Sequence, residues 1–166
     1  MKNFVNHFVT TAYLVNNGKI ALVKHGLRNI WLGFGGHIEK NEGILEALKR
    51  EIQEESGIEN YTLLNETAGK TFPARTKTPD NIVREETIPN SIQIQPIPFD
   101  SNFTEPHHHI DLVYYGVTNQ TKLQLEDDGG SDISWFTEKE LDEIEIWPST
   151  KYLCLQALKA ARRLNE

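Results

Sequence analysis

The chain has 166 residues, 38% of them hydrophobic and 25% charged, which suits one compact domain. Its single cysteine, Cys154, excludes an intramolecular disulfide and is consistent with a reducing compartment. The excess of 24 acidic over 17 basic residues gives a net charge of −7, which argues against general binding to nucleic acid. No apolar run approaches the roughly 20 residues that cross a bilayer. We therefore expect one cytoplasmic domain over residues 1–166, with neither nucleic acid nor a membrane as its partner.

The first elements in the chain are predicted to be a β-hairpin and a glycine-rich segment. Two β-prone runs, at 4–15 and 20–23, flank the sequence Asn16-Asn17-Gly18-Lys19, which is typical of a hairpin turn. A loop then leads into Ile30-Trp31-Leu32 and the glycine cluster Gly33-Phe34-Gly35-Gly36.

Residues 43–56 are predicted to form a helix that Gly57 ends, because apolar residues recur there at three- and four-residue spacing. On a helical wheel the apolar side chains occupy a sector from roughly 300° through zero to 100°. Glu51 and Glu55 fall inside this sector, and Glu54 falls on its border. These carboxylates are therefore expected at a buried edge of the helix.

Two interpretations of these carboxylates are open. Most acidic helices expose a face of ion pairs, and Arg50 can pair with Glu46 or Glu54 at four-residue spacing. A solvated face lies opposite the apolar stripe, however, and these carboxylates do not. Carboxylates that converge at a buried edge raise one another's pKa unless a cation neutralises them. Because Mg²⁺ or Mn²⁺ held by oxygens can do so and keep waters for substrate phosphates, the spacing favours a metal site.

The segment from about 66 to 106 differs from the rest because it holds six of the seven prolines. Proline disfavours helix interiors and central strands, so we expect loops that join short edge strands such as 91–95. A long irregular stretch in a small domain is usually functional or mobile. We expect this segment to form a loop over the active site.

The remaining elements alternate between strands and helices. Strands are predicted at 58–64, 109–117 and 133–136, with a turn at 126–130. Thr137-Glu138-Lys139-Glu140 is a capping box that opens a short helix, and Pro148 begins a final helix to about Leu164. This order of elements predicts an α+β or mixed-sheet sandwich.

Residues 36–58 resemble an intact Nudix box: Gly, five residues, Glu, seven residues, Arg-Glu-aliphatic, one residue, Glu-Glu, one residue, Gly-aliphatic. Every fixed position matches, at Gly36, Glu42, Arg50, Glu51, Ile52, Glu54, Glu55, Gly57 and Ile58. The box covers 23 of the 166 residues. The resemblance implies a single Nudix hydrolase domain, with the α+β Nudix fold in which a mixed β-sheet lies between α-helices.

The resemblance also implies a reaction, the hydrolysis of a nucleoside diphosphate linked to a further group X. Water attacks a phosphorus atom, and divalent metal ions neutralise the developing charge. By position in the box, Glu51, Glu54 and Glu55 would bind Mg²⁺ or Mn²⁺, with the carbonyl of Gly36 as a further ligand. Arg50 would orient Glu51 through an ion pair.

The resemblance leaves the general base open. In some members it is the glutamate after the box arginine, here Glu51. In others it is a carboxylate on a later loop, here Glu105, or with less support Asp111 or a histidine of the run 107–109. Glu42 would serve an outer metal shell or hold the loop.

Four residues are candidates for contact with the substrate. Gly35 and Gly36 would let the backbone approach the pyrophosphate closely, since they lack a Cβ. Phe34 would either pack in the core or stack on the base. We expect one or two of the histidines at 107–109 to face the nucleotide cleft, with His109 as the candidate and a structural role as the alternative. Three consecutive side chains on a strand cannot all face one metal ion.

The sequence around the box favours one substrate class. The glycine cluster and the ending Gln53-Glu54-Glu55-Ser56-Gly57 are similar to oxidised purine nucleoside triphosphatases, which implies a triphosphate cleaved to monophosphate and pyrophosphate. Pro73 lies near where ADP-ribose pyrophosphatases often carry a proline, so ADP-ribose or a nucleotide sugar is the alternative. Some Nudix domains are non-catalytic nucleotide sensors, but these tend to lose box carboxylates. Nudix domains often dimerise, so a homodimer is a further expectation.

Overall fold

The computed structural model describes residues 5–65, 71–73, 82–97, 106–125 and 130–165. Within these ranges no helix combines the length and the apolar character that crossing a membrane requires. The elements, in chain order, are β1 (Val5–Asn16), β2 (Lys19–His25), β3 (Ile30–Leu32), β4 (Phe34–His37), α1 (Ile44–Ser56), β5 (Thr62–Leu63), β6 (Thr71–Pro73), β7 (Ile82–Arg84), β8 (Ser91–Ile97), β9 (His107–Val117), β10 (Gly130–Thr137), the 3₁₀ turn η1 (Glu140–Asp142), α2 (Pro148–Arg162) and the 3₁₀ turn η2 (Arg163–Asn165).

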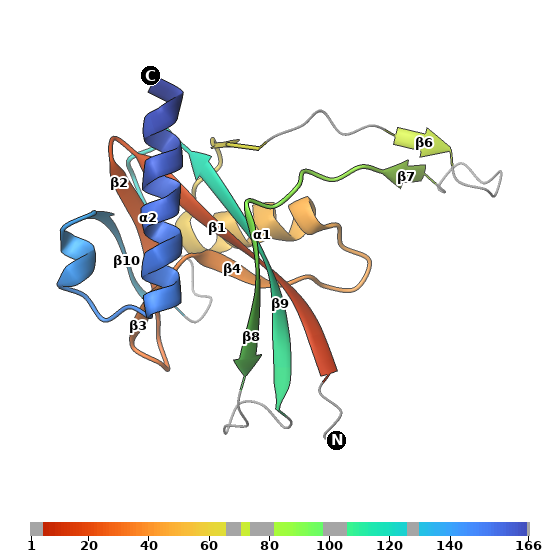
Figure 1. Ribbon diagram of the computed structural model, residues 1–166, viewed down its shortest axis with the longest axis horizontal. Coiled ribbons are helices and arrows are strands. Elements are labelled where there is room, and N and C mark those ends of the chain that lie inside the picture. Colours follow the sequence, from red (N-terminus) through yellow and green to blue (C-terminus); the bar gives the residue numbers. More distant parts are fainter. Residues whose placement is uncertain (1–4, 66–70, 74–81, 98–105, 126–129, 166) are drawn as a thin grey trace.

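A mixed sheet of eight strands forms the centre of the described structure (Figure 1). β1 and β9 pair in parallel along their whole lengths, from Val5 opposite His107 to Val15 opposite Val117. β2 and β4 pair antiparallel with β1, and β5 and β8 pair antiparallel with β9. β10 and β3 continue the sheet from β2. The predicted mixed-sheet α+β fold is confirmed.

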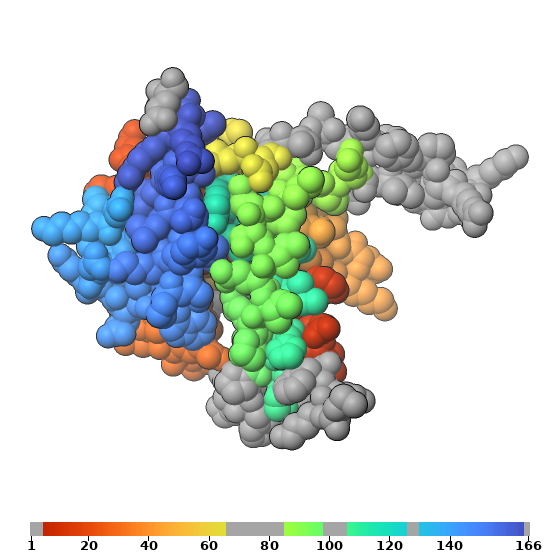
Figure 2. Space-filling model, in the orientation of Figure 1, coloured from red at the N-terminus to blue at the C-terminus, as the bar shows by residue number. Residues whose placement is uncertain are grey.

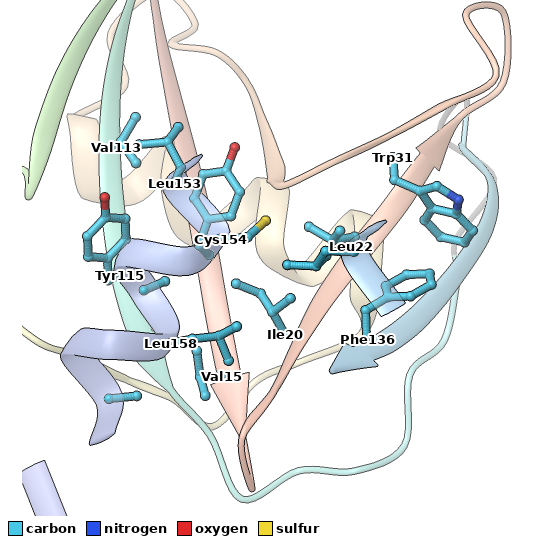
Figure 3. Close-up of a cluster of buried hydrophobic side chains, with 14 residues drawn as sticks. Val15, Ile20, Leu22, Trp31, Val113, Tyr115, Phe136, Leu153, Cys154 and Leu158 are labelled. Atoms are coloured by element: carbon cyan, nitrogen blue, oxygen red, sulfur yellow. The ribbon is translucent and has the colours of Figure 1, made fainter. Parts of the chain in front are cut away.

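The two long helices cover opposite faces of this sheet, with α2 in front of it and α1 behind it in Figure 1. Successive side chains of a strand point to opposite faces, so β1 contributes to both cores. Val15 packs with Leu153 and Leu158 of α2 (Figure 3). Tyr13 belongs to the same cluster. The core beneath α1 contains side chains of β1, β4 and the helix itself: Ala12, Leu14, Phe34, Leu48 and Ile52.

The local predictions for the hairpin and the box helix are confirmed. Asn17 and Gly18 both have positive φ, 47° and 75°, which is the backbone of the tight turn that Asn-Gly favours. α1 begins after Gly43, whose N–H donates to Glu46 Oε2 at 2.8 Å. It ends at Gly57 in the left-handed conformation, with φ 63°, and the Gly57 N–H bonds to the carbonyl of Gln53.

The strand predicted at 58–64 is wrong over most of its length, since only Thr62–Leu63 pairs with β9. Side chains accept the hydrogen bonds of backbone N–H groups that a strand would use for pairing. The Ile58 N–H donates to Ser56 Oγ, and the Glu59 N–H donates to the side chain of Gln120. The chain therefore leaves α1 as a loop fixed by side chains rather than as a strand.

The later elements follow the predictions with small changes in their ends. β9 begins two residues before the predicted strand, because its parallel pairing with β1 continues to His107. The capping box is present, with Thr137 N–H donating to Glu140 Oε2 at 2.7 Å, but the helix after it is a single 3₁₀ turn. α2 has the predicted start at Pro148.

The proline-rich segment is described only in part. β8 contains the predicted strand 91–95 and pairs with β9 alone among the described strands. It lies on the surface in Figure 2, as expected of an edge strand. β6 and β7 form a separate two-stranded sheet, which lies apart from the main sheet in Figure 1. Residues 66–70, 74–81 and 98–105 lie outside the described residues, as does most of the turn predicted at 126–130. The loop over the active site stays a prediction.

Candidate active site

Two consecutive glycines of β4 contact two of the box carboxylates. The N–H of Gly35 donates to Glu55 Oε2 at 2.7 Å. A Cβ added to Gly36 would lie 2.3 Å from Glu51 Oε1, well inside van der Waals contact. Only glycine allows β4 and Glu51 to approach this closely. The strand and the helix therefore bring Glu51 and Glu55 to the same short piece of backbone.

Arg50 joins the third carboxylate to this group. Its Nη1 donates to Glu51 Oε1 at 2.6 Å and to Glu54 Oε2 at 3.2 Å. Its Nη2 also donates to the carbonyl of His37 at 3.1 Å, which ties the guanidinium to the end of β4. The ion pair expected between Arg50 and Glu51 is present.

Glu42 forms a second ion pair with Arg50, on the other side of the guanidinium. Arg50 Nε and Nη2 donate to the two oxygens of Glu42 at 2.9 and 3.0 Å, a two-pronged arrangement that fixes both side chains. Glu42 also accepts from the Glu39 N–H, and hydrogen bonding to Arg50 lowers the pKa of Glu42. This partner raises the pKa of Arg50 in turn, so the pair stays ionised. Glu42 thus holds the loop before α1, one of its two expected roles.

The box carboxylates lie where the helical wheel predicts. Glu51 is only 8% exposed and lies beside the buried Ala47, Leu48 and Ile52. Glu54 and Glu55 are half-buried. Three carboxylates contact the one guanidinium of Arg50, and Glu55 lies beside them on the Gly35 N–H, so the formal charge of the group is strongly negative. Oxygen donors with an excess of negative charge at a partly buried edge suit a hard divalent cation.

A cavity of about 340 Å³ opens beside the same glycines. Gly35 and Gly36 line it together with side chains from β1, β8, β9 and the start of α2. Its volume lies within the range of about 300–1,000 Å³ that is usual for small-molecule sites. The glycine segment therefore contacts the carboxylates and borders the cavity at once.

Asp111 is the buried carboxyl of this cavity, 4% exposed. Thr11 Oγ1 donates to its Oδ1 at 2.9 Å, and Gln95 Nε2 lies 3.4 Å from its Oδ2. Burial disfavours the charged form and raises the pKa of Asp111 to about 6, although the bond from Thr11 opposes the shift. Thr11 and Gln95 belong to no recognisable sequence motif. They reach Asp111 only because β1 and β8 pair with β9.

Three predicted residues lie in different surroundings. His109 lines the cavity, and burial and then the neighbouring His37 lower its pKa to about 4, so its imidazole is neutral at pH 7. The side chain of Phe34 is fully buried in the core beneath α1, which is the packing role and leaves no ring face for a base. Glu105 lies outside the described residues.

Comparison with known structures shows the same fold. A NUDIX-family hydrolase from Clostridium perfringens is similar over 95% of this chain and 97% of its own, with a TM-score of 0.68 and 24% identity. A MutT NUDIX hydrolase from Burkholderia pseudomallei is similar over 92% and 98%, with a TM-score of 0.60 and 19% identity. The NUDIX domain of Shewanella oneidensis NrtR was solved in complex with ADP ribose. It is similar over 100% of this chain and 91% of its own chain, with a TM-score of 0.55 and 13% identity.

Comparison at the level of sequence gives the family. Curated protein sequences give no significant match. The sequence model of the NUDIX domain matches residues 6–156, which is most of the chain and includes the box, β1, β9 and the larger part of α2. The chain therefore belongs to the NUDIX domain family and is a hydrolase that acts on pyrophosphate bonds in nucleoside diphosphate derivatives.

Proposed function

We propose that this chain cleaves a nucleoside triphosphate to a nucleoside monophosphate and pyrophosphate, with Mg²⁺ or Mn²⁺ as its cofactor. The observation that carries the proposal is the double role of Gly35 and Gly36, which contact Glu55 and Glu51 and also border the cavity. In this proposal the phosphates extend along the glycines toward the carboxylates, and the base occupies the cavity.

The donors at this site fit a hard divalent ion. Glu51, Glu54 and Glu55 supply carboxylate oxygens, and the carbonyl of Gly36 is a further oxygen where no Cβ intervenes. When bound, Mg²⁺ would offset the negative charge that develops on the phosphate oxygens.

Arg50 acts as a positioning residue in this proposal. It holds one oxygen of Glu51 and one of Glu54, and Glu42 fixes the guanidinium from the other side. For the proton acceptor of the attacking water we propose Glu51 or Glu105, ahead of Asp111 and the histidines at 107–109, which the sequence also leaves open.

The cavity supports a nucleobase as the group that is recognised. Asp111, Thr11 and Gln95 place a carboxyl, a hydroxyl and an amide along its lining, so both donors and acceptors face a bound base. His109 borders the same space as a neutral imidazole. A base held by such groups would be read by its hydrogen-bonding edge.

ADP-ribose is the second candidate substrate, because the similar NUDIX domain from Shewanella oneidensis was solved in complex with it. The complete set of box carboxylates supports catalysis over sensing for this chain. The two substrate classes differ in their products, since a triphosphate releases pyrophosphate whereas ADP-ribose does not.

The proposal is tested by assaying phosphate, pyrophosphate and nucleotide products with Mg²⁺ and with chelator. The panel holds canonical and oxidised nucleoside triphosphates, ADP-ribose, nucleotide sugars and dinucleoside polyphosphates. We expect chelator-sensitive release of pyrophosphate from one triphosphate class. Turnover of ADP-ribose alone would replace the proposed substrate, and binding without turnover would favour a sensor.

Substitutions within the site sharpen this test. Glu54→Gln should lower kcat by at least about 100-fold because it removes a metal ligand. Glu59→Gln changes an exposed glutamate outside the box and should leave kcat unchanged. Full activity of Glu54→Gln would remove Glu54 from the mechanism. A loss in Glu105→Gln that matches the loss in Glu51→Gln would make Glu105 the proton acceptor.

A further inference from the structure

Four histidines from three strands gather beside the cavity, separate from the box carboxylates. They are His7 of β1, His37 of β4, and His107 and His109 of β9, and one ring nitrogen of each lies within 4.8 Å of the others. No other set of three or more metal-ligating side chains is drawn together in this way among the described residues. His107 is 3% exposed and its Nε2 lies 3.1 Å from Nε2 of His109.

The sheet explains why these four side chains meet. The parallel register places His7 opposite His109, and the two-residue period of a strand puts His107 and His109 on one face. His37 pairs with Val9, two residues along β1 from His7, and so lies on that same face. His108 points to the opposite face, as the alternation requires. Two histidines of the run and two distant ones therefore converge where three consecutive ones cannot.

The ring contacts show that the cluster is compact. The His7 centroid lies 4.3 Å from that of His107 and 5.4 Å from that of His37, and the His37 centroid lies 4.9 Å from that of His109. Four imidazoles at such distances can direct one ring nitrogen each toward a common point. Neutral imidazoles present lone pairs, which is the form that binds a metal ion.

We propose that His7, His37, His107 and His109 together bind one divalent transition-metal ion, with Zn²⁺ as the representative ion. Imidazole nitrogens suit Zn²⁺, Cu²⁺ and Ni²⁺, whereas Mg²⁺ prefers the oxygens of the box. A tetrahedral ion with Zn–N bonds of about 2.0–2.1 Å separates its ligand nitrogens by about 3.4 Å. The widest pair in the cluster must therefore close by at most about 1.4 Å, which side-chain rotation can supply.

The composition of the site indicates its role. Four protein ligands fill a tetrahedral shell and leave no position for water, which is typical of a structural metal rather than a catalytic one. The ion would join the ends of β1, β4 and β9. His37 follows Gly36, and its carbonyl accepts from Arg50, so the ion would also steady the strand that contacts the catalytic carboxylates.

The proposal is tested by titrating Co²⁺ and Zn²⁺ into chain that carries no purification tag and has been freed of metal by chelator. Excess Mg²⁺ is present throughout, so that the carboxylate site is occupied. We expect one Co²⁺ per chain, with the intense visible absorption of a tetrahedral ion, and its displacement by Zn²⁺. Absence of this absorption, together with no heat of Zn²⁺ binding, would overturn the proposal.

Three variants locate the ion. His109→Gln and His7→Gln should each weaken Zn²⁺ binding by at least about 10-fold. His108→Gln removes a histidine of the same run that points to the other face, and should bind like the wild type. Equal losses in His108→Gln and His109→Gln would overturn the proposal. So would loss of Zn²⁺ binding in Glu54→Gln, because that would place the ion at the box.

A stability measurement separates loss of the site from loss of the fold. Zn²⁺ that binds only the folded chain raises its Tm, so the wild type and His108→Gln should melt higher with Zn²⁺ than with chelator. His7 is half-buried near the start of β1. In chelator, the Tm of His7→Gln should therefore be close to that of the wild type, and Zn²⁺ should not change it. A Zn²⁺ shift in His7→Gln equal to that of the wild type would count against the site.

Discussion

At Gly36 the missing Cβ decides how closely β4 and Glu51 approach each other in the candidate active site. A side chain there would meet Glu51 Oε1 at 2.3 Å, so the strand and the carboxylate could not keep their positions together. The atoms in the way are the far end of a flexible side chain, and the glutamate can swing aside. The cost of a larger residue at position 36 therefore falls on the geometry of the carboxylate more than on the fold.

Gly36→Ala is accordingly expected to lower kcat by at least about 10-fold while lowering the free energy of unfolding by no more than about 1–2 kcal/mol. The matched control is Gly43→Ala, where the added Cβ would lie 3.2 Å from the nearest atom and φ is −79°. Its kcat should stay close to that of the wild type. The two kcat values and two urea titrations check this, and wild-type activity in Gly36→Ala would contradict it.

At the scale of the element, the loop after α1 shows how side chains can take the place of a strand. Gln120 Nε2 donates to the carbonyl of Gly57 at 2.7 Å, and its Oε1 accepts from the Glu59 N–H at 3.2 Å. Thr118 Oγ1 donates to the carbonyl of Asn60. One amide side chain from the segment just after β9 thus fixes the exit of the box helix.

We expect Gln120→Ala to lower the free energy of unfolding by about 1–3 kcal/mol, because it leaves three backbone groups, of Gly57, Glu59 and Lys122, without their partner. Asn119→Ala alters an exposed neighbour and should change the stability by less than about 0.5 kcal/mol. Chemical denaturation of both variants measures the difference. Equal stabilities would mean that water replaces the Gln120 amide at no cost.

A feature could be predicted from the sequence when the residues that determine it are close together along the chain. The Asn17-Gly18 turn and the helix between Gly43 and Gly57 were predictable because neighbouring residues set their backbone angles. The three box carboxylates were predictable from their spacing along that helix. The loop at 58–61 was not, because the Gln120 side chain that holds it is remote in the sequence.

The cavity and the histidine cluster depend on residues that are about 100 positions apart in the sequence. Thr11 and Asp111 meet because β1 and β9 pair in parallel, and no local pattern predicts which strands will be neighbours. The same register brings His7 to His109. The sequence therefore predicted the box helix, the fold family and part of the cavity lining, namely Gly35, Gly36 and His109. It did not predict Thr11 or Gln95, which join that lining only through strand pairing.

At the scale of the whole molecule, Asp111 makes folding stability depend on pH. Its pKa is raised from 3.8 to about 6 in the folded chain, so the folded state binds the proton more tightly than the unfolded state. The stabilisation from this proton is complete below about pH 4 and is lost as the pH rises through about 6. The loss amounts to about 3 kcal/mol, from about 1.4 kcal/mol per unit of pKa.

Asp111→Asn should remove this dependence, since an amide does not titrate. The free energy of unfolding of the variant minus that of the wild type should rise by about 3 kcal/mol between about pH 4 and pH 8. Urea unfolding of both proteins in chelator, at several pH values, measures the difference and cancels the groups that they share. A difference that does not vary with pH would contradict the raised pKa of Asp111.

The parallel pairing of β1 with β9 also sets an order of events during synthesis. β1 lies at the centre of the sheet, yet the strand that completes one of its edges ends at Val117. The hairpin and the box helix can form as soon as they leave the ribosome, while the open edge of β1 must wait for some hundred further residues. The box carboxylates therefore take their places early, whereas the cavity closes late. A nascent chain that ends before residue 107 exposes the whole of that edge to any other strand.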